Sequence, residues 1–341
     1  MSRVVVVGAG AIGGSIAFEL RRRGHDVVVV SDPARRPAAF VAAGMLAPVA
    51  EAWFGEERLL AIGLESVRLW PQFAQSLATT TGVDVGLSTA GSVLVAATER
   101  DRPEFDRLMG FHRELGLDVE RLTRRDVRAL EPALSPSLRA AARIPDDLSV
   151  DNRAFLTALE SADVIAARVT TVDARGVQLD NGRRVDGDVV VVAAGWATRE
   201  LVPVEVRPVK GEVVRVRGER LIERTIRGIV DGSTVYLVPR ANGEIVIGAT
   251  MDEKGEDTRV LAGGVYELLR DANALVPGIK ELEFREVAAG LRPGSPSNAP
   301  IVTVIDHVVV ATGHFRNGVL LAPWTARRAA ELVDSELGGR V

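Results

Sequence analysis

Three glycines near the N-terminus have the spacing of a dinucleotide-binding turn. Gly8, Gly10 and Gly13 follow an apolar run, and a helical pattern begins directly after them. The first glycine would permit a tight turn, the second would let the backbone approach a pyrophosphate, and the third would let the helix pack on the strand. The N–H groups at the helix start would bind the phosphates. Asp32, after the next apolar run, would hold a ribose; this pattern does not distinguish NAD(P) from FAD.

The elements that position these residues follow from the apolar runs around them. Residues 4–7 and 27–30 are short β-branched runs and predict two buried strands. The segment between them predicts a helix with Ile12, Ile16 and Leu20 on one face. The opening of the chain is therefore expected to be one βαβ unit with the glycine turn at its first corner.

Two later runs of the same kind indicate that the chain returns to this parallel sheet. After Asp188, residues 189–194 are wholly apolar and are followed by Gly195, and residues 307–312 are followed by Gly313. A central parallel strand that ends in small residues leaves room for a ligand. Between these runs, residues 204–250 are rich in short strands and turn signals, which predicts an antiparallel sheet as a second architecture.

Composition excludes several classes of function. The chain of 341 residues has no cysteine, so disulfides, thiolate catalysis, cysteine-ligated metals and a cysteine-linked flavin are excluded, and its four histidines lack metal-ligand spacing. A net charge of −4 gives no support for nucleic-acid binding. The longest uncharged stretch, residues 4–18, is too short to span a membrane and shows no cleavage-site pattern. We expect a cytoplasmic protein.

The opening alone would equally suit an NAD(P)-dependent reductase. Such enzymes usually follow the nucleotide domain with a largely helical one, whereas this chain has a β-rich middle and a late strand, glycine and helix. A helix starting near residue 320, just after Gly318, could stabilise the negative charge of a reduced flavin. The second half of the chain therefore favours FAD.

Four motifs give this chain a specific resemblance. The motifs are AAGMLAP at residues 42–48, YLVPR at 236–240, GLRP at 290–293 and ATGHFRNGVLLAP at 311–323. The chain resembles the glycine oxidases of thiamine biosynthesis, a group within the D-amino-acid oxidase family of FAD flavoproteins, and the resemblance covers nearly its whole length.

The resemblance implies an α/β plus α+β fold, in which a Rossmann-type FAD-binding domain is interleaved with a substrate domain built on an antiparallel sheet. The expected FAD-binding segments are residues 1–82, 140–206 and 290–341, and the expected substrate-binding segments are 83–139 and 207–289. FAD would be bound non-covalently. The residues expected to bind it are Gly8, Gly10, Ile12, Gly13, Asp32, Ala43, Gly44, Met45, Gly195, Gly313, Arg316, Gly318, Val319 and Leu320.

The same resemblance implies oxidation of a small amino acid. Arg292 matches the family's carboxylate-binding arginine, Tyr236 its tyrosine partner, and Arg316 a residue beside substrate and flavin, while Met251 would narrow the pocket. A guanidinium grips a carboxylate with two hydrogen bonds and a phenol adds a third. Hydride transfer from a neutral amine needs no protein base.

The expected reaction converts glycine through its imine to glyoxylate and reduces oxygen to hydrogen peroxide. Sarcosine or a small D-amino acid as substrate, a dehydrogenase that passes electrons to a quinone, an NAD(P)-dependent reductase and a non-catalytic FAD-binding relative remain alternatives. The family further implies hand-off of the product to a thiazole synthase, and we expect a homo-oligomer.

This sequence departs from the family pattern at three positions that concern the cofactor. Ser31 stands where relatives have an acid and Asp32 follows one residue later, which reverses the face of the strand. Ala39 replaces a serine that would face the phosphates, and Ser297 replaces an aspartate. We expect Asp32, rather than Ser31, to contribute to FAD binding.

Overall fold

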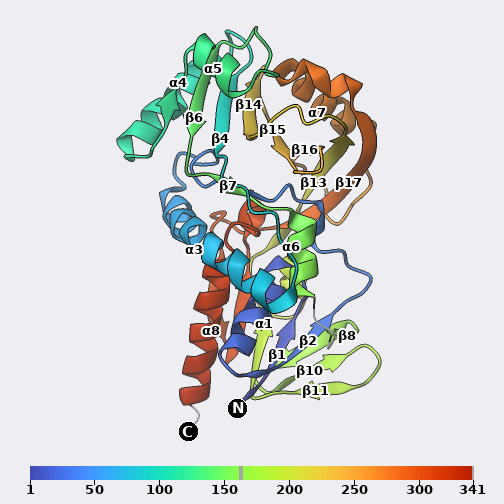
Figure 1. Ribbon diagram of the computed structural model, residues 1–341. Helices are drawn as coiled ribbons and strands as arrows, with labels where there is room; N and C mark the ends of the chain where they lie inside the picture. Colours follow the sequence, from blue (N-terminus) through green and yellow to red (C-terminus); the bar gives the residue numbers. More distant parts are fainter. Residues whose placement is uncertain (161–163, 340–341) are drawn as a thin grey trace.

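The computed structural model describes residues 1–160 and 164–339, so residues 161–163 and 340–341 of the expected FAD-binding segments lie outside the described residues. Two sheets divide the molecule, with the chain termini at the end that carries the parallel sheet (Figure 1). The predicted combination of a parallel and an antiparallel sheet is confirmed.

The parallel sheet has six strands, and β18 alone among its described strands runs antiparallel to its neighbour. In spatial order they are β18 (Ile301–Ile305), β19 (Val308–Thr312), β12 (Val189–Val192), β1 (Arg3–Val7), β2 (Asp26–Ser31) and β8 (Val164–Ala166). Both faces of its central strands are buried, which explains why their sequences are unbroken valine runs.

Each face of the parallel sheet has its own cover. Helices α1 (Ala11–Arg22) and α8 (Ala322–Gly338) pack on one face through alternate strand residues such as Val4 and Val6. The other face, which includes Val5 and Val7, packs against a three-stranded sheet. That sheet consists of β9 (Val169–Asp173), β10 (Gly176–Leu179) and β11 (Arg184–Asp186).

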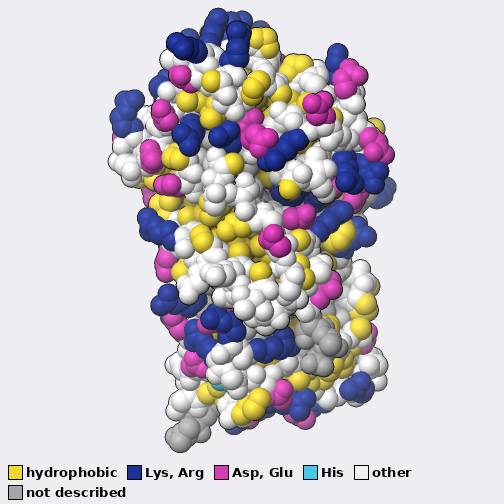
Figure 2. Space-filling view, in the orientation of Figure 1, with side chains coloured by type: hydrophobic (Ala, Val, Ile, Leu, Met, Phe, Trp, Pro, Cys, Tyr) yellow, Lys and Arg dark blue, Asp and Glu magenta, His cyan; other side chains and the backbone are white. Residues whose placement is uncertain are grey.

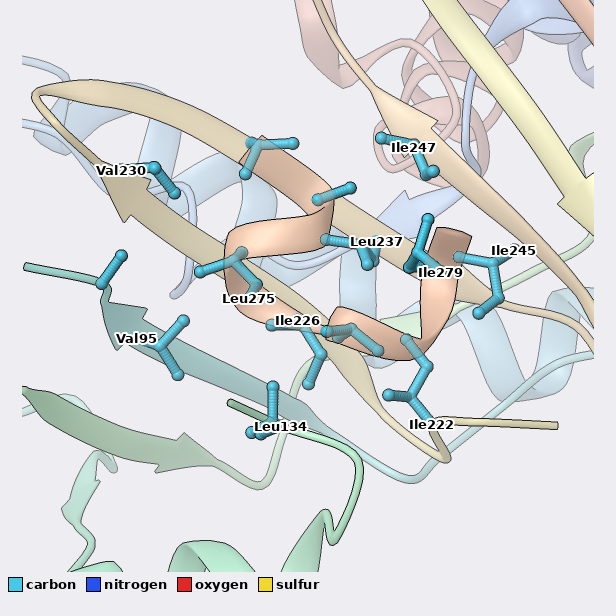
Figure 3. Packing of buried hydrophobic residues seen from close by; sticks show 14 of the residues in the cluster. Val95, Leu134, Ile222, Ile226, Val230, Leu237, Ile245, Ile247, Leu275 and Ile279 are labelled. Carbon is cyan, nitrogen blue, oxygen red and sulfur yellow. The ribbon is translucent and has the colours of Figure 1, made fainter. Parts of the chain in front are cut away.

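The antiparallel sheet has eight strands, which pair antiparallel except for the parallel pair of β4 and β14. In spatial order they are β17 (Glu283–Gly294), β13 (Arg207–Arg217), β16 (Glu244–Gly248), β15 (Ser233–Pro239), β14 (Thr225–Val230), β4 (Ser92–Ala96), β6 (Ala140–Ile144) and β5 (Glu120–Arg121). Helix α7 (Ala262–Leu275) covers one face, and Figure 3 shows its Leu275 beside Ile226 and Leu237 in a buried apolar cluster. This sheet therefore has a hydrophobic core of its own.

The remaining elements connect the two sheets or cover them. They are α2 (Ala38–Val41), β3 (Met45–Leu46), α3 (Glu57–Thr81), α4 (Arg102–Glu114), α5 (Arg124–Leu130), β7 (Leu148–Ser149), α6 (Asn152–Leu159), and the 3-10 turns η1 (Gly195–Glu200), η2 (Pro277–Glu281) and η3 (Phe315–Asn317). Helix α6 lies in the middle of the molecule, between the two sheets (Figure 1). No helix among the described residues is long and apolar enough to cross a membrane.

Two of the expected segment boundaries fall inside the antiparallel sheet. Residue 140 was expected to begin an FAD-binding segment, but it begins β6, which pairs with β4. Residue 290 was expected to begin another, but β17 pairs with β13 without a break from Glu283 to Gly294 apart from one bulge. Strand pairing therefore places residues 140–144 and 290–294 with the antiparallel sheet.

Candidate active site

A long cavity lies where the carboxyl ends of β1, β2, β12 and β19 meet β13, β15 and β17. Ligands of open parallel sheets bind at this edge, beyond the carboxyl ends of the strands. The sequence-predicted residues that line it are Gly8, Gly10, Ile12, Asp32, Ala43, Gly44, Met45, Gly195, Tyr236, Arg292, Arg316, Gly318 and Val319. The structure thus brings together residues from every motif that the sequence singled out.

The three glycines of the first turn differ in their surroundings. Gly8 has a φ of +106°, and a Cβ there would lie 2.4 Å from the carbonyl oxygen of Ala193. A Cβ at Gly13 would lie 1.9 Å from the carbonyl oxygen of Gly8, so Gly13 permits close helix packing and does not line the cavity. A Cβ at Gly10 would come no closer than 3.6 Å to a neighbouring atom, the Cβ of Pro37. The space in front of Gly10 is open toward the cavity, as a pyrophosphate requires.

The start of α1 offers backbone donors to that space. Its N-cap residue, Gly10, has no side chain that could accept hydrogen bonds from the first turn, and no acidic residue stands there. The unpaired N–H groups at such a start favour an anion.

Ser31, the last residue of β2, and Asp32, the next residue, both line the cavity. One carboxylate oxygen of Asp32 accepts a hydrogen bond from the Ala34 N–H at 2.9 Å. The other lies 3.5 Å from Nε of Arg35. Asp32 therefore shapes the loop after β2 as well as facing the cavity.

Arg292 and Tyr236 line the cavity from β17 and β15. Nη1 of Arg292 donates to the carbonyl oxygens of Lys210 at 3.2 Å and Thr250 at 3.1 Å. Burial lowers the pKa of Arg292, and the neighbouring Tyr236 opposes that shift. Burial also raises the pKa of Tyr236, so the phenol keeps its proton at neutral pH. The pair offers a fixed cation and a neutral donor to an anionic group.

Two glycines make room for this pair, and the sequence reading did not identify either. A Cβ on Gly211 of β13 would lie 2.2 Å from both terminal nitrogens of Arg292. A Cβ on Gly248 of β16 would lie 2.4 Å from Cζ and the hydroxyl oxygen of Tyr236. Each side chain thus crosses a neighbouring strand at a glycine, a contact that only the strand register reveals.

A buried ion pair, which the sequence reading also did not identify, lies beside Arg292 and Tyr236. Nη1 of Arg227 lies 3.0 Å from Oε1 of Glu51, and both side chains are about 10% exposed. Burial is the largest influence on Arg227 and lowers its pKa, while Glu51 opposes that shift. Glu51 lines the cavity, and its negative charge acts to raise the pKa of both Arg292 and Tyr236. No motif in the sequence marks these two residues.

Arg316 and His314 close the cavity after β19. Arg316 lies 3.9 Å from a carboxylate oxygen of Glu56. Nε2 of His314 is 2.9 Å from the Thr325 hydroxyl, and burial lowers the pKa of this histidine to about 3, so it is neutral. Within the described residues, His314 Nδ1 and Arg316 Nε have no hydrogen-bond partner. Buried polar atoms of this kind are available to a polar ligand.

Three predicted residues besides Gly13 do not line the cavity. Met251 is 64% exposed, outside the cavity wall, instead of narrowing the pocket. Gly313 supplies a left-handed turn after β19, with a φ of +73°. Leu320 is buried in the helical layer, where its carbonyl oxygen accepts hydrogen bonds from Ser66 and Trp70. Its role there is to join α3 to the segment before α8.

Comparison with known proteins defines the class. The model of the family DAO, FAD dependent oxidoreductase, matches residues 3–332. The chain therefore belongs to the DAO family of FAD-dependent oxidoreductases.

Particular relatives agree with this assignment. The chain is 35% identical to a glycine oxidase of Geobacillus kaustophilus, an alignment that covers 97% of this chain and 92% of the relative. It is 30% identical to a bifunctional ThiO/ThiG protein of Trichormus variabilis, of which it covers 52%. The crystal structure of the Geobacillus kaustophilus glycine oxidase superposes with a TM-score of 0.87 at 32% identity, covering 98% of this chain and 95% of that one.

The residues of the cavity fit FAD. The open approach at Gly10, the uncapped start of α1 and the small residues of the segments 42–44 and 193–195 leave space for a flat dinucleotide along the wall. Gly318 lines the far end, where a Cβ would meet only His314, at 3.8 Å. The helix expected to start near residue 320 is confirmed as α8, which begins at Ala322, and the 3-10 turn η3 (Phe315–Asn317) lies just before Gly318.

Proposed function

We propose that this chain is a flavin-dependent amino-acid oxidase whose substrate is glycine. The proposal rests mainly on one observation, the Arg292 guanidinium held beside the Tyr236 phenol in the same cavity as the cofactor-binding residues. It is supported by the relatives named glycine oxidase. The balanced reaction consumes glycine, oxygen and water, and yields glyoxylate, ammonia and hydrogen peroxide.

The chain's own residues bind and orient the substrate in this scheme. The fixed fork of Arg292 takes the carboxylate, and the Tyr236 hydroxyl donates to the same group. Because the carboxylate is anchored, the Cα–H bond is held in one orientation, which removes most of the entropic cost of alignment. Bound FAD supplies the two-electron acceptor.

The protonation states of the cavity agree with amine oxidation. Among the described residues, the one histidine that lines the cavity is His314, whose pKa of about 3 makes it neutral and a poor base. Glu51 is already paired with Arg227 at 3.0 Å. The substrate amine therefore has to arrive neutral, and the rate should rise with pH as free amine becomes available.

The visible spectrum provides the test. We expect the purified protein to carry a flavin that glycine bleaches under anaerobic conditions, and air to restore the colour with release of one hydrogen peroxide per glyoxylate. Sarcosine and D-alanine should be oxidised with lower kcat/KM than glycine. A flavin that glycine leaves oxidised would refute the substrate, and recolouring by a quinone but not by air would make the enzyme a dehydrogenase.

We also propose that the product passes to a thiazole synthase. Support comes from the bifunctional ThiO/ThiG relative, half of which this chain matches. A glycine imine hydrolyses readily in water, so a consuming enzyme would have to act on a freshly formed product. Co-incubation with a thiazole synthase should increase thiazole formation over that seen with added glyoxylate and ammonia.

A further inference from the structure

The segment of residues 38–44 forms one wall of the cofactor cavity, yet it has little means of holding its own shape. It consists of the four-residue helix α2 and the small residues Ala42, Ala43 and Gly44. Only Phe40 and Val41 have large side chains. Its backbone carbonyl groups therefore need partners from elsewhere in the fold.

Asn152, the first residue of α6, supplies two of those partners. Its Nδ2 donates to the carbonyl oxygens of Ala39 at 2.7 Å and Phe40 at 3.1 Å. Its Oδ1 accepts from Nη2 of Arg215 at 3.1 Å and from Nη2 of Arg240 at 3.2 Å. A primary amide has two donors and two lone pairs, and all four are used here in a fully buried position.

The two arginines also contact the wall directly. Arg215 of β13 donates to the carbonyl oxygen of Ala42, and Arg240, the residue after β15, donates to that of Ala43. Both side chains are buried, and their charges face acids. Arg215 pairs with Glu244, and Nε of Arg240 lies 4.0 Å from Asp151.

This cluster connects the two halves of the site. The arginines belong to the antiparallel sheet, whose strand β15 also carries Tyr236, while the wall follows β2 of the parallel sheet. Within the wall residues 39–43, four of the five carbonyl oxygens, all but that of Val41, accept hydrogen bonds from this cluster. Nothing in the chemistry proposed above uses these side chains.

We propose that Asn152, Arg215 and Arg240 are positioning residues that set the shape of the 38–44 wall for FAD. A wall fixed in advance reduces the ordering cost of binding the cofactor. The cluster does not depend on which amine is oxidised, so its test is independent of the proposed substrate. Substrate turnover enters that test only as a secondary readout.

The substitution Asn152→Asp tests the hydrogen bonds that Asn152 donates to the wall. A carboxylate keeps both acceptors for the arginines but replaces the two donors to Ala39 and Phe40 by an oxygen that repels their carbonyl groups. We expect the dissociation constant of FAD, measured by flavin-fluorescence quenching on the apoprotein, to rise by about tenfold or more. The kcat of the enzyme saturated with FAD should stay within about twofold, because the substrate-binding side chains are unchanged.

Arg240→Gln provides a second variant should the first fold poorly, and Arg224→Gln provides the matched control. Arg224 pairs with the buried Glu131 at 3.2 Å in the same half of the molecule, and its side chain donates to Leu130 and Glu131 instead of to the 38–44 wall. We expect both arginine variants to lower the Tm of the apoprotein, and only Arg240→Gln to weaken FAD binding. If Asn152→Asp and Arg240→Gln bind FAD as tightly as Arg224→Gln does, the cluster is merely structural and the proposal fails.

Discussion

At the scale of single residues, the site depends on a guanidinium whose position is fixed by backbone rather than by acids. Arg292 donates to two carbonyl oxygens, and the nearby carboxylate of Glu51 is occupied by Arg227. The positive charge of Arg292 therefore remains available to a ligand. A substrate carboxylate supplies the missing counter-charge, which favours anionic substrates over simple amines.

Arg292→Ala should reduce kcat/KM for glycine by roughly 30-fold to several thousand-fold, because an unpaired carboxylate in this cavity costs about 2–5 kcal/mol. Arg292→Lys should recover only part, since an ammonium lacks the two-pronged geometry. Steady-state peroxide assays measure both variants. An amine without a carboxylate serves as the control and should respond little. If Arg292→Ala keeps the original kcat/KM, the carboxylate binds elsewhere, with Arg316 as the next candidate.

Gly211→Ala should imitate the loss of Arg292 without removing any charge. The new Cβ would occupy the space of the guanidinium, whose nitrogens lie 2.2 Å from it, so the side chain has to leave its seat. We expect KM for glycine to rise by about tenfold or more, with FAD content unchanged. Gly263→Ala is the control, because a Cβ there meets nothing within 4 Å. Equal KM values for the two variants would contradict the position of the Arg292 guanidinium over Gly211.

At the scale of elements, two connecting segments decide the details of the site. The loop after β2 begins with Asp32, which lines the cavity beside Ser31 at the end of the strand, and the turn after Leu46 brings Glu51 to the cavity. In both segments backbone N–H groups donate to a carboxylate, that of Asp32 in the first and that of Asp147 in the second. Such bonds determine loop shape where no ladder does.

Asp32→Ala should weaken FAD binding more than Ser31→Ala. The carboxylate both faces the cavity and accepts the Ala34 N–H at 2.9 Å, so its removal loses a ligand contact and loosens the loop. A difference of about tenfold or more in the dissociation constant is expected, as for a charged hydrogen bond. Fluorescence titration of the two apoproteins measures it. The reverse order would mean that Ser31 faces the ribose.

Asp147 should make stability depend on pH. Its carboxyl group is fully buried and accepts hydrogen bonds from Val49 and Ala50, and burial raises its pKa from 3.8 to about 7. The folded chain therefore binds a proton that the unfolded chain has released between about pH 4 and pH 7, so stability falls as pH rises through this window.

Asp147→Asn removes this ionisation and should flatten that part of the profile. The Tm of the variant minus that of the original protein should grow by roughly a few degrees as the pH is raised from 5 to 8. Thermal melts at constant ionic strength measure the difference. A constant difference between the two proteins across this range would show that Asp147 does not titrate there.

At the scale of the whole molecule, the active site exists only where the two sheets meet. The parallel sheet supplies the cofactor-binding turn, and the antiparallel sheet supplies Arg292 and Tyr236. The face in Figure 2 carries Lys and Arg interspersed with Asp and Glu, with hydrophobic side chains gathered near its middle. A cofactor that contacts both halves should hold them together.

FAD should therefore raise the Tm of the protein in proportion to the logarithm of its free concentration. Each tenfold increase adds about 1.4 kcal/mol once FAD exceeds its dissociation constant, which is roughly 2–4 °C for a chain of this size. Gly10→Val is the control, because its Cβ would make only an ordinary contact with Pro37, at 3.6 Å, while the side chain would occupy the space beside the turn. A Tm that rises with FAD in this variant would show that the turn does not bind the pyrophosphate.

The sequence by itself determined the parallel strands, and it predicted the first turn and the two residues that we propose bind the substrate carboxylate. Local rules were sufficient there: Gly8, Gly10 and Gly13 act on a turn within six residues, and β-branched runs mark strands buried on both faces. The motif around Arg292 identified a residue that composition alone would have assigned to the surface.

Only the tertiary structure decided what depends on strand register and on contacts distant in sequence. Gly211 lies under Arg292, 81 positions later, because β13 and β17 pair in one register. Asn152 reaches Ala39 and Arg240 through the packing of three separate elements, and Met251, three residues after β16 ends, is 64% exposed. Such contacts leave no periodic signal, since each joins residues whose spacing along the chain is arbitrary.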